Sequence, residues 1–136
     1  MRRFLTILLV LTGSFVLSCG DSGPSEPKPN ENPVPGWLSV RLSTPNADDG
    51  GIMFTISGGQ IDSIKSAYPD LFTSSAGNAS KQVIVAGHLP TGVVVAELLV
   101  PNVELVANYG ATVEQVAARD TYQQRPVSGV SLVVER

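Results

Sequence analysis

Reactive and metal-binding side chains are scarce in this sequence of 136 residues. It contains one cysteine, Cys19, and one histidine, His88. A single cysteine excludes a disulfide within the chain, and a single histidine excludes the histidine clusters that hold zinc. No G-x-S-x-G nucleophile motif is present, and His88 precedes Leu89-Pro90 in a segment that is typical of an exposed turn. We therefore expect no enzymatic activity, no metal site and no cofactor.

An excess of positive charge is also missing. The chain has nine basic and twelve acidic residues, a net charge of −3. Arg2 and Arg3 account for two of the basic residues, so residues 19–136 carry seven basic and twelve acidic residues, a net charge of −5. Nucleic-acid binding requires a basic surface that neutralises phosphates. We expect no nucleic-acid partner.

The N-terminal apolar run is too short for a confident membrane span. It begins at Phe4 and ends at Leu17, whereas a transmembrane helix needs about 20 apolar residues. Arg2 and Arg3 precede the run. A short apolar run behind a basic start is typical of a secretory signal. We predict that residues 1–18 form an export signal.

The end of this signal has a recognisable pattern. Val16-Leu17-Ser18-Cys19 resembles the lipobox of bacterial lipoproteins, in which an aliphatic residue, a tolerant position and a small residue precede a lipidated cysteine. The resemblance implies cleavage between Ser18 and Cys19 and attachment of fatty acyl chains such as palmitate to Cys19. The protein would then be anchored in a cell membrane on the extracytoplasmic side, and Gly20 points to the outer membrane if the organism has one. The alternative is an ordinary secretory signal with an incidental cysteine.

A proline-rich segment follows. Residues 19–36 contain five prolines and few apolar side chains, so they cannot bury enough surface to fold. Proline-rich chains favour an extended polyproline II form with a rise of about 3.1 Å per residue. We predict a disordered tether that holds the following domain up to roughly 50 Å from the membrane.

Residues 37–136 show the two-residue hydrophobic alternation and the β-branched runs of strands. Five segments are predicted to be strands: residues 38–42, 52–56, 82–86, 92–100 and 130–134. Residues 44–51 are turn formers and are predicted to be a loop. In the fourth segment we expect an inward face and a second, unexplained apolar face. The inward face is Val94, Ala96, Leu98 and Val100, and the second face is Val93, Val95 and Leu99.

Residues 103–118 fit helical spacing as well as alternation, so periodicity alone leaves both structures open. Gly110 disfavours a helix. A bulge near residues 114–115 would place Val113 and Val116 on one face of a strand. We therefore predict a strand.

Short strands separated by turns predict an all-β fold, a single antiparallel sandwich of immunoglobulin-like or cohesin-like type over residues 37–136. The segments LSVRLSTPNADDGGIMFTISG, GVVVAELLVPNVELVANYGATVEQVA and SGVSLVV resemble cohesin-type and related carbohydrate-binding sandwich domains, and also short bacterial lipoproteins. Ser57-Gly58-Gly59 stands where cohesins carry an aromatic-Asp-Pro step, so no dockerin-contacting residue is carried over.

Four aromatic residues have a polar end and are candidate ligand contacts: Trp37, Tyr68, Tyr109 and Tyr122. Trp37 and Tyr109 lie in patterned segments, so we expect them to be buried. Tyr122 lies among hydrogen-bonding side chains in a predicted loop, and we predict that it contacts a ligand together with Gln124 and Arg125.

Asp48 and Asp49 offer carboxylates for calcium, but a calcium site needs six to eight oxygen ligands and the sequence has no calcium-loop motif. We predict that the two residues belong to a turn. For the whole chain we predict a membrane-anchored, non-catalytic lipoprotein whose sandwich binds a protein partner in the cell envelope. The alternative is a carbohydrate-binding module at the cell surface.

Overall fold

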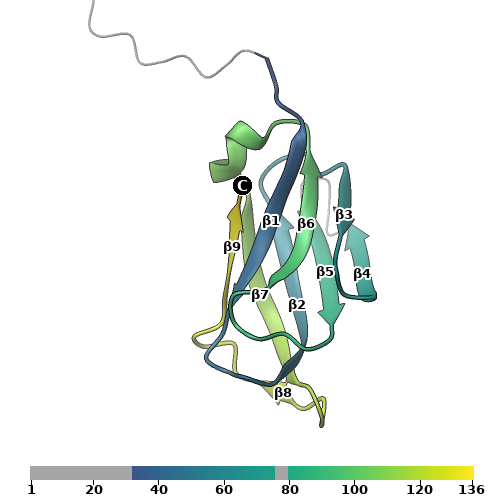
Figure 1. Cartoon of the computed structure of the whole chain (residues 1–136), viewed down its shortest axis with the longest axis vertical. Coiled ribbons are helices and arrows are strands. Elements are labelled where there is room, and N and C mark those ends of the chain that lie inside the picture. The colour runs from purple at the N-terminus through teal and green to yellow at the C-terminus, as the bar shows by residue number, and fades with distance from the viewer. Residues whose placement is uncertain (1–31, 76–79) are drawn as a thin grey trace, which may run out of the picture.

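The computed structural model describes residues 32–75 and 80–136. Two antiparallel sheets pack face to face, which confirms the predicted β-sandwich (Figure 1). The four-stranded sheet has, in spatial order, β3 (Ser63–Lys65), β6 (Val94–Val100), β1 (Gly36–Ser43) and β9 (Ser131–Glu135). The five-stranded sheet has β4 (Asp70–Ser75), β5 (Ser80–Ala86), β2 (Asp49–Ser57), β7 (Gly110–Ala118) and β8 (Gln124–Arg125). A 3₁₀ helix, η1 (Val103–Asn108), connects β6 to β7.

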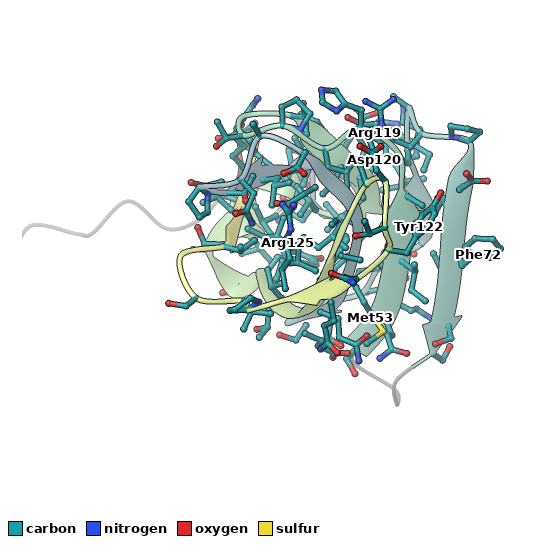
Figure 2. The ribbon with its side chains drawn as sticks, turned by 90° about the horizontal axis from the view of Figure 1, so that it is seen from below. Met53, Phe72, Arg119, Asp120, Tyr122 and Arg125 are labelled. Carbon is teal, nitrogen blue, oxygen red and sulfur yellow. The ribbon has the colours of Figure 1, made fainter. Side chains whose placement is uncertain are left out.

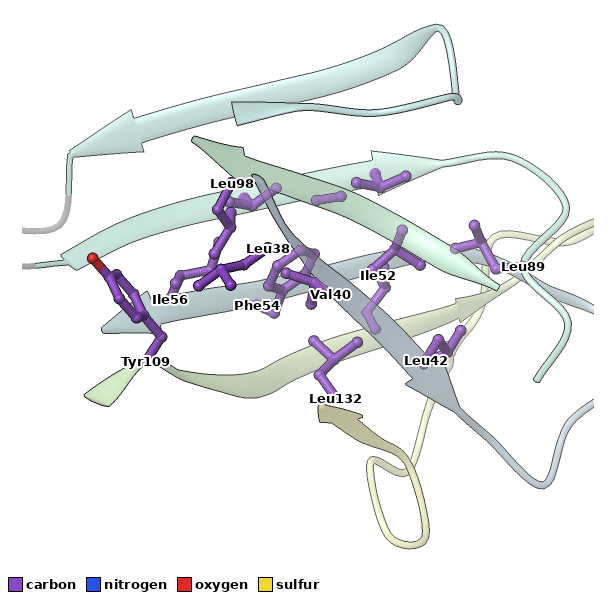
Figure 3. Close-up of a cluster of buried hydrophobic side chains, with 14 of the residues drawn as sticks. Leu38, Val40, Leu42, Ile52, Phe54, Ile56, Leu89, Leu98, Tyr109 and Leu132 are labelled. Carbon is purple, nitrogen blue, oxygen red and sulfur yellow. The ribbon is translucent and has the colours of Figure 1, made fainter. Parts of the chain in front are cut away.

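The core consists of aliphatic side chains from alternate strand positions, with Phe54 fully buried near the middle of β2 (Figure 3). The two segments with the clearest alternation supply six buried residues: Leu38, Val40, Leu42, Ile52, Phe54 and Ile56. Burial of one such side chain contributes about 1.5–3 kcal/mol to folding. Two-residue alternation was therefore a sufficient guide to the core of β1 and β2.

A bulge changes the predicted side-chain directions in β6. Pairing with β1 shifts between Val40 and Arg41, which leaves Val95 as an extra residue. Beyond the bulge the prediction is confirmed by three buried residues: Ala96, Leu98 and Val100. Before the bulge, the side chains point to the faces opposite to those predicted, because an inserted residue shifts the alternation by one position. Val95 is fully buried and Val94 lies outside the core cluster, so the prediction of an inward Val94 is wrong.

The prediction of a strand over residues 103–118 is wrong for residues 103–108 and confirmed for residues 110–118. The first part is η1, whose start is capped by the Asn102 side chain accepting a 3.1 Å hydrogen bond from the Glu104 amide. The second part is β7. Its register with β2 shifts so that Glu114 is the extra residue, which confirms the predicted bulge. Val116, beyond the bulge, is buried in the core.

The remaining differences concern segment ends and short strands. β2 begins at Asp49, so the predicted loop 44–51 is shorter than expected. The sequence patterns did not predict β3, β4 or β8. The folded part also extends slightly before residue 37, because β1 begins at Gly36 and the Val34 carbonyl accepts a 2.9 Å hydrogen bond from the Val103 amide. Across the described residues, no helix has the length and apolar character that crossing a membrane requires.

Candidate functional site

The two outer faces of the sandwich differ in chemistry. On the four-stranded sheet, charged side chains of neighbouring strands are paired. The Arg41 guanidinium lies 2.6 Å from the Glu135 carboxylate, and the Lys65 ammonium lies 3.2 Å from the Glu97 carboxylate. These charged side chains of the four-stranded sheet are therefore paired with one another within the molecule.

The five-stranded sheet instead presents an apolar row. Strand register places four residues side by side on its outer face: Phe72, Ile84, Met53 and Gln115. Phe72 is 63% exposed and Ile84 is 41% exposed. Adjacent exposed apolar side chains on a sheet face are typical of an interaction surface rather than of an ordinary solvent-facing strand.

The neighbouring row, two residues away along each strand, consists mainly of residues with short side chains. It consists of Asp70, Ala86, Gly51, Ala117 and Gln124. Its three central members have little or no side chain, so the surface sinks between the apolar row and the β7–β8 turn. The resulting hollow has a volume of about 380 Å³, and its lining includes Met53, Ile84, Gln115, Tyr122 and Gln124. That volume lies near the small end of the range for ligand sites.

A polar row lies on the other side of the apolar one. It consists of Ser74, Gln82, Thr55 and Thr112. The carboxylate of the bulge residue Glu114 accepts hydrogen bonds from the Thr55 hydroxyl and, at 2.8 Å, from the side-chain amide of Gln82. These two bonds, the Thr55 bond first, lower the pKa of Glu114. The apolar row is therefore bordered by polar groups, as the core of a binding surface usually is.

Tyr122 stands over the hollow from the β7–β8 turn. Its amide donates a 3.0 Å hydrogen bond to the Ala118 carbonyl, and the Ala118 amide donates a 2.9 Å bond to the Gln123 carbonyl, which closes the turn. Tyr122 is the only non-glycine residue with positive φ in the described ranges 32–75 and 80–136, at 53°, and it is 76% exposed. Figure 2 shows Tyr122 on this turn, with Met53 and Phe72 projecting from strands of the same sheet.

A left-handed conformation costs a residue with a Cβ about 1–2 kcal/mol, and glycine or asparagine usually occupies such positions. A bulky aromatic residue that keeps this conformation and stays exposed gains little from packing. Backbone strain of this kind concentrates at functional sites.

The turn is held in place by contacts with the β1–β2 loop. The Arg119 amide donates a 2.9 Å hydrogen bond to the Asp48 carbonyl. Gly50 permits this close approach, because a Cβ there would lie 2.2 Å from the Arg119 Cα. The placement of Tyr122 thus depends on two segments that are about 70 residues apart in the chain.

Arg125, predicted as a ligand contact, belongs to this support. Its guanidinium makes two 2.7 Å hydrogen bonds to Asp48 and a 3.0 Å bond to Asp49. The Asp48 bond raises the pKa of Arg125, and the same bond lowers the pKa of Asp48. Gln124 does line the hollow, so the structure brings Tyr122 and Gln124 together there while Arg125 is engaged in ion pairs.

Asp48 lies in the loop before β2, as predicted, whereas Asp49 is the first residue of β2, so the prediction of a turn is wrong for Asp49. The Asp49 carboxylate is 1% exposed. It accepts hydrogen bonds from the Thr44 hydroxyl at 2.6 Å and from the side-chain amide of Asn46 at 3.1 Å. No group of three or more potential metal ligands occurs in the part of the chain that the structure describes. The Asp49 carboxylate therefore serves to hold the β1–β2 loop and Arg125 in place.

The aromatic predictions have mixed outcomes. Tyr109 is buried as predicted, and its hydroxyl donates a 2.8 Å hydrogen bond to the Gln60 carbonyl. Burial raises the pKa of Tyr109, with a smaller contribution from Asp62. The prediction that Trp37 is buried is wrong: it is 40% exposed on the outer face of β1, where the Lys65 ammonium lies 4.1 Å from its ring centre.

Phe72 was not among the predicted contacts. Phe72 lies in the polar segment DLFTSS, which shows no clear alternation. Its side chain has no polar end, so it was not one of the candidate aromatic contacts. A lone phenylalanine among Asp, Thr and Ser was the available signal. The predicted lipidation and cleavage residues, Cys19 and Ser18, lie outside the described residues.

Comparison of the chain with protein-family models, with curated proteins and with solved structures gave no match. Any proposal about the function of this chain must therefore be argued from the chemistry of its own surface.

Proposed function

We propose that this protein is a lipid-anchored, non-catalytic binding protein of the cell envelope, and that it binds with the outer face of its five-stranded sheet. One observation carries the proposal: Tyr122, held in a left-handed conformation and 76% exposed, stands over a hollow beside the exposed Phe72 and Ile84. A strained residue and an apolar surface that water must solvate both cost stability, and binding a second molecule would offset both costs.

The anchor is part of the same proposal. Val16-Leu17-Ser18-Cys19 is similar to a lipobox, and the proline-rich segment up to residue 36 would serve as the tether. Lipid on Cys19 would hold the domain on the extracytoplasmic side of the membrane, and of the outer membrane where one exists. A surface module on a spacer is suited to reaching other components of the envelope.

Two classes of ligand fit this role. A protein partner is the first candidate from the sequence, and the apolar row of Phe72, Ile84 and Met53 with its polar border supports it. A glycan is the second candidate, and a specific observation favours it: Tyr122 and Phe72 are two exposed aromatic rings on one face, which a sugar-binding platform requires.

Site-specific photo-crosslinking in cells tests the proposed face. A benzophenone amino acid at Gln115 or Gln124, beside the hollow, should capture an envelope component. The same probe at Ser39, in β1 of the other sheet, is the matched control. Equal capture from both faces, or none from either, would refute the assignment of the binding face.

A further inference from the structure

Tyr122 lines two hollows. One is the 380 Å³ hollow with the apolar row at its edge, and Tyr122 also lines a second hollow of about 170 Å³. The second hollow has a polar lining that includes Asp70, His88 and Arg119, and its floor is formed by Gly50, Ala86 and Gly87. A ligand that crosses Tyr122 would meet an apolar surface on one side and charged side chains on the other.

The polar side chains of the second hollow retain free hydrogen-bonding capacity. The Arg119 guanidinium lies 3.3 Å from the His88 Nδ1, which must accept the bond because a guanidinium only donates. Within the described ranges, Arg119 has no ion pair with a carboxylate, and the Asp70 carboxylate has no hydrogen bond or ion pair. This hollow therefore offers a free carboxylate acceptor and free guanidinium donors near one exposed aromatic ring.

This combination matches the chemistry of a sugar. Each hydroxyl group both donates and accepts hydrogen bonds, so neighbouring hydroxyls can bond a carboxylate and a guanidinium together. The C–H groups of a sugar ring form an apolar face with partial positive charge, which packs on the negative face of an aromatic ring. Gln115 and Gln124 add amide donors and acceptors at the larger hollow.

A protein partner fits the same surface less well. It would have to bring charges of opposite sign to both Asp70 and Arg119, because a charge that is buried without a partner costs several kcal/mol. A protein interface of standard size also covers about 800 Å² on each side, which needs a broad surface. Here the surface has short side chains at Gly51, Ala86 and Ala117 and two small hollows, which suits a small ligand.

We infer that the ligand of this face is a neutral glycan of at least two sugar units, with one unit over the apolar hollow and the next bonded to Asp70 and Arg119 across the Tyr122 ring. This inference rests on the proposed binding face and adds the ligand class and the second subsite. Tyr122 lines both hollows and their other lining residues differ, so we expect one sugar unit in each hollow.

The test is glycan binding by the full chain, purified in detergent. The probes are an array of neutral glucans, mannans, galactans and xylans together with glycan strands of peptidoglycan. At least one neutral glycan should bind saturably, and its disaccharide or trisaccharide should bind more tightly than the monosaccharide. Tyr122→Ala should weaken binding about tenfold or more, as loss of a central aromatic contact usually does. Asp70→Asn and Arg119→Ala should weaken it by a smaller factor.

Two variants control for indirect effects. Trp37→Ala removes an exposed aromatic ring from the opposite sheet and should leave glycan binding unchanged. Tyr122→Gly removes the ring and also the left-handed strain, so a loss of binding with an undiminished melting temperature would assign the effect to the ring itself.

The outcomes separate this inference from the proposed function. Absence of binding to every neutral glycan, or equal binding by wild type and Tyr122→Ala, overturns the glycan inference. If Gln115 then cross-links to an envelope protein, the binding face stands and its ligand is a protein. If neither glycan binding nor cross-linking occurs, the proposed function fails as well.

Discussion

Arg125 and Asp49 are 76 residues apart in the chain, yet the Arg125 guanidinium donates a 3.0 Å hydrogen bond to the buried Asp49 carboxylate. This contact joins β8 to the start of β2 and closes the end of the sandwich that carries Tyr122. The Asp49 carboxylate is the shared acceptor of Arg125, Thr44 and Asn46. It is therefore the centre of the support beneath the proposed site.

Asp49→Ala should lower the free energy of unfolding by about 1–3 kcal/mol, because it leaves the buried Thr44 hydroxyl without its acceptor and releases Arg125. Urea denaturation measures this difference. Asp62→Ala, at an exposed residue, is the control and should change stability by less than about 0.5 kcal/mol. Equal effects of the two substitutions would mean that the Asp49 network contributes nothing specific.

Two phenylalanines of the five-stranded sheet, Phe54 in β2 and Phe72 in β4, offer a matched comparison. Phe54 is fully buried and Phe72 is 63% exposed. Phe54→Asp should unfold the domain, since an unpaired buried charge costs several kcal/mol against a total stability of roughly 5–15 kcal/mol. Phe72→Asp should leave it folded. Circular dichroism and melting curves check both, and an unchanged melting temperature for Phe54→Asp would place this residue outside the core.

Stability should fall in acid. The Arg125 bond lowers the pKa of Asp48, and bonds from Thr55 and Gln82 lower the pKa of Glu114. A carboxyl group with a lowered folded-state pKa stabilises the fold above its unfolded pKa, about 4, and this stabilisation is lost as pH falls through the folded value. Melting temperatures should therefore decline below about pH 4. Glu114→Gln should flatten part of this decline.

Tyr122→Gly should stabilise the domain by about 1 kcal/mol, because glycine adopts positive φ without the steric cost of a Cβ. The greater backbone entropy of glycine in the unfolded state reduces this gain. Thermal melting compares the variant with wild type. A marked loss of stability would show that the Tyr122 ring supports the fold, and would remove strain from the case for a binding role.

The predicted anchor is tested at Cys19. Two acyl chains hold a protein on a membrane far more firmly than one, which gives only marginal binding of about 10⁴ M⁻¹. The wild-type protein should incorporate radiolabelled fatty acid and remain in the membrane through high-salt and carbonate washes. Cys19→Ser should take up no label, and should be either uncleaved or soluble. A wild-type protein that lacks label and leaves the membrane in salt would reduce Ser18-Cys19 to the end of an ordinary signal.

Sequence patterns predicted the parts of the fold in which burial acts on every second residue. β1, β2 and the bulge at Glu114 follow from alternation, because each inward position carries an apolar side chain. The bulge at Val95 was not predicted. Val93, Val94 and Val95 are identical, so the sequence shows no alternation that an inserted residue could interrupt. The exposure of Trp37 agrees with the alternation of β1, because Trp37 shares the odd-numbered face of this strand with Ser39 and Arg41. The prediction of burial relied on the position of Trp37 in a patterned segment and not on its phase.

The proposed site was predictable only in part. Tyr122 and Gln124 stood out because they lie in a polar loop, where binding residues concentrate. Their neighbours at the hollow, such as Met53 and Ile84, come from distant strands, so only the register of the sheet brings them together. Likewise, no local pattern indicates that Arg125 reaches Asp48 and Asp49 rather than a ligand.

The sandwich has a polarity along its length. The described chain enters β1 beside η1, and Arg136 lies near the same end, whereas β8 and its turn lie at the other end (Figure 1). β2 alone has nine residues, which span roughly 30 Å at about 3.3 Å per residue. A tether on the N-terminal side would thus join the domain at the end opposite Tyr122. A reporter fused after Arg136 would sit at the end away from Tyr122 and leave the proposed site uncovered.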